Sequence, residues 1–147
     1  MSYRQKKGEF NMKKTENVEL CGTDLDVVIS NFLHHAGVPA HVKGYYYVRE
    51  AIRLSIGDFA YLEGITKVLY PTVAKHHKTT SSRVERAIRH AISIAWERGT
   101  LQNVGSTLYS KPTNSEFIAL VSDQIRLLQK SAGARSQSYM KSGLLIR

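Results

Sequence analysis

Residues 81–96 restrict the fold of this chain more than any other segment, because their apolar side chains recur at helical spacing. The apolar positions are Val84, Ala87, Ile88, Ala91, Ile92 and Ala95. They fall on one side of a helix with 3.6 residues per turn, the pattern of a helix that buries a single face. A strand would need alternating apolar and polar residues, and no alternating run long enough for a strand occurs. The sequence therefore predicts an all-α fold.

Capping and turn residues divide the chain into six predicted helices. We expect them at about 23–35, 43–56, 59–69, 71–78, 81–96 and 113–130, with a weaker helical pattern at 100–110. Gly37 and Pro39 end the first helix, and Pro71 suits the first position of the fourth. The expected inward-facing residues outside 81–96 are Leu25, Val28, Ile29, Phe32 and Leu33, then Tyr45, Val48, Ala51, Ile52 and Ser55, then Leu62, Ile65, Val68 and Leu69, and finally Phe117, Ile118, Val121, Ile125 and Leu128. The spacing Thr113-x-x-Glu116 is a capping box for the last helix.

Positive charge gathers around residues 71–96, which predict a short helix, a polar turn and a longer basic helix. The chain carries 21 Lys and Arg against 12 Asp and Glu, a formal net charge of +9. Opposite the apolar stripe of 81–96 lie Ser82, Arg83, Arg86, Arg89 and His90, with Glu85 at the border between the two faces. A helix-turn-helix places its second helix in the major groove of DNA, where Arg can grip guanine O6 and N7 with two hydrogen bonds.

Two structural explanations of the same residues compete with a DNA-reading role. Glu85 and Arg89 have the spacing of an ordinary surface ion pair on a solvated helix. Ser82-x-x-Glu85 also fits a capping box, which would occupy both side chains at the helix start. Lys130 likewise either complements the dipole at a helix C-terminus or reaches a phosphate.

The sequence favours one cytoplasmic domain without catalytic or metal-binding machinery. Cys21 is the single cysteine, so no intrachain disulfide or cysteine-rich zinc site is expected. The adjacent pairs His34–His35 and His76–His77 point about 100° apart on a helix, so neither pair is expected to chelate one ion. No segment approaches the roughly 20 apolar residues that cross a bilayer, so we expect no membrane partner. We expect no cofactor and no enzymatic activity, a disordered arm over 1–22, a helical domain over 23–131 and a flexible tail over 132–147.

Four segments together resemble the C-terminal DNA-binding effector domain of the sporulation response regulator, stage zero sporulation protein A. They are GVPAHVKGYYYVREAI (37–52), ITKVLYPTVA (65–74), SSRVERAIRHAI (81–92) and KPTNSEFIALVSDQIRL (111–127). The resemblance implies a six-helix bundle holding a helix-turn-helix, like a winged-helix effector domain without a sheet. It further implies recognition of TGTCGAA-like boxes in double-stranded DNA, tandem binding as a dimer, and contact with the sigma factor of RNA polymerase. Matching positions assign base reading to Ser82, Arg83, Glu85 and Arg86, and DNA backbone contacts to Arg89, His90 and Lys130.

The chain departs from the family pattern in two respects. Only some twenty polar residues precede the helical region, so we expect no phosphate-accepting receiver domain in cis. The connection between 81–96 and the last helix looks shorter than usual for the family. These departures leave a second hypothesis open, an interaction module that docks on RNA polymerase or on a related full-length regulator without reading DNA. Nonspecific RNA association driven by the net charge is a third.

Overall fold

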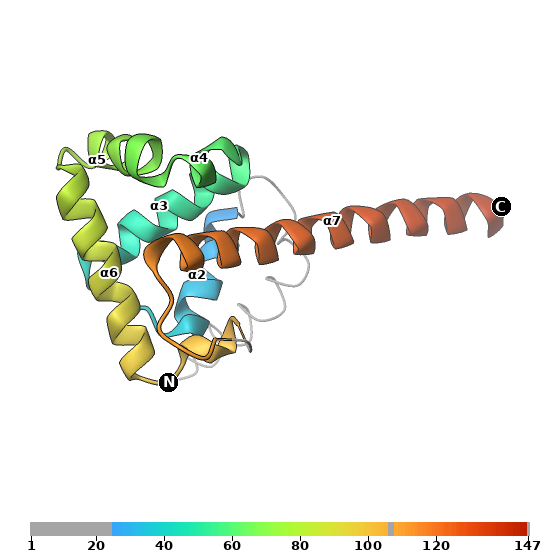
Figure 1. Ribbon diagram of the computed structural model, residues 1–147. Helices are drawn as coiled ribbons and strands as arrows, with labels where there is room; N and C mark the ends of the chain where they lie inside the picture. Colours follow the sequence, from blue (N-terminus) through green and yellow to red (C-terminus); the bar gives the residue numbers. More distant parts are fainter. Residues whose placement is uncertain (1–24, 106–107, 147) are drawn as a thin grey trace, which may run out of the picture.

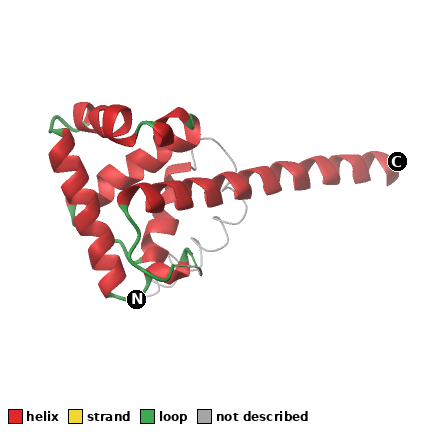
Figure 2. Cartoon of the chain, in the orientation of Figure 1, coloured by secondary structure: helices red, strands yellow, loops and turns green. Residues whose placement is uncertain are grey.

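The computed structural model describes residues 25–105 and 108–146, and within these ranges it contains six α-helices and no strand (Figure 2). The helices are α2 (Leu25–Ala36), α3 (Lys43–Gly57), α4 (Ala60–Glu63), α5 (Tyr70–His76), α6 (Ser81–Glu97) and α7 (Asn114–Ile146). A π-helical turn, η2 (Ile65–Leu69), precedes α5, and a 3₁₀ turn, η3 (Leu101–Asn103), follows α6. The predicted all-α class is confirmed. The predicted arm over 1–22 lies outside the described residues.

Helix α3 lies at the centre of the bundle, where it packs against α2, α6 and α7 (Figure 1). Its inward face consists of Tyr45, Val48, Ala51, Ile52 and Ser55, all buried, as the sequence predicted. Gly44 makes the close approach of α3 to α6 possible, because a Cβ at this position would overlap the backbone carbonyl of Ala87. The core helix and the basic helix are therefore in direct backbone contact.

The apolar stripe of α6 anchors this helix to the core. Its buried residues are Val84, Ile88, Ala91, Ile92 and Ala95, and Ala87 is partly buried. Complete burial of a Val or Ile side chain stabilises a fold by roughly 1.5–3 kcal/mol relative to exposure. The burial of this one stripe fixes which residues of α6 face outward.

The segment expected as one helix over 59–69 is divided at Gly64. Helix α4 ends there, and the backbone continues through η2 directly into α5 without a break. Within η2 the bond from Leu69 N–H to the Gly64 carbonyl, 3.0 Å, spans five residues instead of four. Pro71 has no N–H to donate and its ring crowds the preceding turn, which the wider π geometry accommodates. Pro71 therefore lies inside a continuous helical path.

Helix α7 is longer than predicted, since it runs from Asn114 to Ile146 and projects beyond the other helices (Figure 1). The residues predicted as a flexible tail, 132–147, continue this helix as far as Ile146. After Lys130 the segment contains no proline, and Gly133 and Gly143 each cost a helix only about 1 kcal/mol relative to alanine. Leu128, expected in the core, is half exposed, because it lines an open cavity of about 280 Å³ beside Val28 and Phe32 of α2.

None of the described helices combines the length and the apolar character that a bilayer crossing needs.

Candidate nucleic-acid interface

Helices α5 and α6 form a helix-turn-helix with a four-residue turn, His77 to Thr80. Thr80 is the N-cap of α6, and its Oγ1 accepts a hydrogen bond from the backbone N–H of Arg83 at 3.3 Å. The predicted capping box of Ser82 with Glu85 is therefore wrong, because α6 begins earlier than that spacing requires. Ser82 lies in the first turn with its side chain exposed, and its hydroxyl is not used as a cap.

The predicted contact residues of α6 divide into two groups. Ser82, Arg83, Arg86 and His90 are exposed on the side opposite the buried stripe, and we call these four residues the outward face. Glu85 and Arg89 lie on a flank of the helix and form an ion pair. Both also line a cavity of about 380 Å³ between α6 and the start of α7. The structure thus brings the outward face together as one surface and turns Glu85 and Arg89 toward α7.

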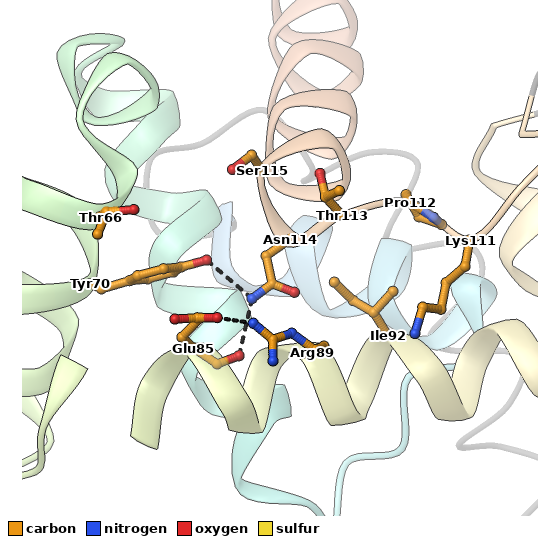
Figure 3. Close-up of a pocket in the computed structure, with 10 residues that line it drawn as sticks. All are labelled: Thr66, Tyr70, Glu85, Arg89, Ile92, Lys111, Pro112, Thr113, Asn114 and Ser115. Carbon is orange, nitrogen blue, oxygen red and sulfur yellow. Dashed lines mark hydrogen bonds and ion pairs between the residues drawn. The ribbon is translucent and has the colours of Figure 1, made fainter. Parts of the chain in front are cut away.

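Asn114 at the start of α7 holds the flank of α6 in place (Figure 3). Its Nδ2 donates to the hydroxyl of Tyr70 at 3.1 Å and to the backbone carbonyl of Glu85 at 3.0 Å. The side chain is buried, so these bonds replace hydration that the amide and the carbonyl have lost. One amide group therefore connects α5, α6 and α7. The sequence carries no local signal for the role of Asn114, because its partners Tyr70 and Glu85 lie 44 and 29 residues away along the chain.

The capping residue before α7 is the one that the sequence predicted. Thr113 Oγ1 accepts from the backbone N–H of Glu116 at 3.2 Å, which is the forward bond of the predicted capping box.

Lys130 is exposed on α7, where it lines an open cavity with Ile56 and Phe59. Lys130 lies sixteen positions after Asn114, which corresponds to roughly 24 Å along a helix axis. Helix α7 starts beside α6 and runs away from it (Figure 1). The structure therefore does not bring Lys130 together with the predicted contact residues of α6.

The turn of the helix-turn-helix is tied to the core by two histidines that were expected to diverge. His77 Nε2 donates to Glu50 Oε2 at 2.6 Å, and His76 Nδ1 donates to the other carboxylate oxygen. The histidines converge because His77 is the C-cap residue, with φ −101° and ψ 10°, and no longer follows the helical direction of His76. Glu50 belongs to α3 and its side chain is only 12% exposed. The end of α5 is therefore fixed to the central helix.

A helical bundle that buries one stripe of α6 and exposes a basic face at the second helix of a helix-turn-helix has the architecture of DNA-binding domains of that class. The family described as sporulation initiation factor Spo0A C terminal matches residues 29–125, more than half of the chain. The chain belongs to this family. It is accordingly a DNA-binding effector domain of transcription regulation in sporulation, and the family is not a catalytic one.

Proposed function

We propose that this chain is a sequence-specific regulator that inserts α6 into the major groove and recognises TGTCGAA-like boxes. The observation that carries the proposal is the outward face of α6, where two guanidinium groups and a free hydroxyl are exposed opposite the buried stripe. A major groove about 12 Å wide admits one α-helix, and its base edges present distinct hydrogen-bonding patterns. The α6 face supplies the donors that such reading requires.

The proposal assigns a role on the DNA to each predicted contact residue of α6. Arg83 and Arg86 each donate two parallel bonds to the O6 and N7 atoms of guanine, and Ser82 bonds a neighbouring base edge. Glu85 accepts from the amino group of cytosine, with its carboxylate oriented by Arg89. Arg89 and His90 bind phosphates on either side of the bases. The box contains both guanine and cytosine, which matches this set of donors and one acceptor.

The remaining contacts of the proposal lie outside α6. Lys130 binds a phosphate at a distance from the base-reading contact, since α7 carries it roughly 24 Å from Asn114. Two copies bind adjacent boxes in tandem, and the sigma factor of RNA polymerase is the protein partner. These three points are supported by the resemblance to the sporulation regulator, which extends over about residues 24–130.

Competition binding tests the proposal against its alternatives. A labelled duplex carrying the box is titrated with the protein, and unlabelled duplex with the box, duplex with a permuted box, or RNA competes. The box duplex should compete at least 10³-fold better than the permuted one, in the range of specific over nonspecific binding. Equal competition by all three polymers would show that the protein binds by nonspecific charge attraction. If the protein bound no duplex but captured RNA polymerase, the result would favour the alternative, an interaction module that does not read DNA.

A further inference from the structure

Three helices of the described chain end on a residue in the left-handed conformation, and one of these residues is not glycine. Gly37 after α2 has φ +86°, Gly99 after α6 has φ +72°, and Lys78 after α5 has φ +52°. This conformation is unfavourable for residues with a Cβ, so glycine usually occupies it at helix ends. The chain follows that rule at two ends and departs from it inside the helix-turn-helix.

The hydrogen bonds around Lys78 are those that glycine would make. At the end of α2, Gly37 N–H donates to the His34 carbonyl at 3.0 Å and the next N–H, of Val38, donates across the turn to Leu33 at 2.9 Å. After α5, Lys78 N–H donates to the Lys75 carbonyl at 3.3 Å and Thr79 N–H donates to Ala74 at 2.9 Å. Both ends thus close with the same backbone pattern. The lysine side chain adds nothing to this turn that glycine would lack.

The Lys78 side chain is exposed and available to a ligand. Among the described residues, no carboxylate lies within ion-pair distance of its ammonium group. It stands two residues before Thr80, the N-cap of α6, and its nearest charged neighbours along the chain on both sides, Lys75 and Arg83, are also exposed cations. Residues in unfavourable backbone conformations cluster at functional sites, which directs attention to the side chain of Lys78.

The position of Lys78 is fixed by the residues before it. His76 and His77 both donate to Glu50 of the central helix α3, so the chain enters the turn from an anchored end. The N-cap bond of Thr80 fixes the exit. The backbone of the turn therefore loses little freedom when the Lys78 side chain binds a ligand, which favours binding.

We propose that Lys78 binds a phosphate of the DNA backbone next to the base-reading contact of α6, and that the strained turn is retained for this side chain. The inference rests on the proposed function of α6. The ammonium group acts as a point charge with three donors, which suits a phosphate and not a particular base. Lys78 therefore contributes to affinity at every sequence and not to discrimination among sequences.

Glycine substitution separates the backbone role from the charge. Lys78→Gly relieves the unfavourable conformation, so the urea midpoint of unfolding should rise. The same variant should bind box duplex several-fold more weakly at 0.1 M salt, and the slope of log Kobs against log salt should become shallower by about 0.9. Lys78→Asn, which tolerates this conformation without glycine's chain freedom, should lower binding in the same way. Lys78→Arg should restore the salt slope of the unmodified chain.

Arg98→Gln is the matched control, because it removes one positive charge beyond the far end of α6, roughly 25 Å from the turn. Its salt slope should equal that of the unmodified chain. Unchanged affinity and slope in Lys78→Gly, with box binding intact in the unmodified chain, would overturn the Lys78 inference alone. A fall in the urea midpoint of Lys78→Gly would overturn the part concerning strain. Absence of box binding in the unmodified chain would overturn the proposed function and the inference with it.

Discussion

Glu50 and His77 are joined by a hydrogen bond of 2.6 Å between Oε2 and Nε2, which links the central helix α3 to the turn of the helix-turn-helix. His76 takes the second oxygen of the same carboxylate. Arg53, one turn further along α3, places its Nη2 3.6 Å from Oε1 of the Glu50 carboxylate. The end of α5 and the turn are therefore held by a side chain of α3, which lies outside both helices of the motif.

Replacement of Glu50 by Gln should destabilise the fold by about 1 kcal/mol, since the amide offers one acceptor oxygen where the carboxylate offers two. The expected loss is small because His76 and His77 are partly exposed and solvent weakens such pairs. Urea unfolding measures the change. Glu63→Gln on the exposed surface of α4 is the control, and equal losses in the two variants would show that the Glu50 contact has no special weight.

Gly44→Ala should destabilise the protein by roughly 1–3 kcal/mol through overpacking between α3 and α6. The added methyl group would overlap the Ala87 carbonyl and approach the Cβ of Ala91 to 2.9 Å. Gly57→Ala at the end of the same helix is the matched control, because no atom lies within 4 Å of its added Cβ. Thermal unfolding of both variants checks this. A Gly44→Ala midpoint as high as that of Gly57→Ala would contradict the close packing of the two helices.

Asn114→Ala should cost about 1–3 kcal/mol, because the buried hydroxyl of Tyr70 and the partly buried carbonyl of Glu85 lose their shared donor. Ser115→Ala, at the adjacent exposed position, should leave stability within about 0.5 kcal/mol of the unmodified chain. Chemical denaturation of the pair gives the comparison. If both variants unfold alike, the amide of Asn114 does not hold α6 against α7.

The parts of the fold that local patterns control could be predicted from the sequence. Val84, Ile88 and Ile92 recur with a helical period and define a single buried face. The exposed face of α6 could therefore be predicted from them. Thr113 as a cap followed from its spacing to Glu116 in the same way. Local patterns also allowed more than one N-cap residue for α6, and in the structure Thr80 is the N-cap and Ser82 is not.

The parts that depend on distant partners could not be predicted. Asn114 finds Tyr70 and Glu85 only after the bundle has closed, and His76 and His77 converge only because α5 ends between them. Leu128 continues the apolar period of α7, but in the folded bundle it lines an open cavity beside Val28 and Phe32 instead of being covered by them. Periodicity specifies a face of a helix but not the length over which a neighbour covers it.

Reading of base pairs by Arg86 is most directly tested by a binding matrix. The unmodified chain and Arg86→Ala are each titrated with the TGTCGAA duplex and with duplexes that carry every single base-pair substitution of it. We expect the unmodified chain to lose on the order of 1–3 kcal/mol at each contacted pair. Arg86→Ala should lose its discrimination at one guanine-containing pair and keep it at the others. A uniform weakening across all duplexes, or an unchanged preference at every position, would contradict base reading by the outward face of α6.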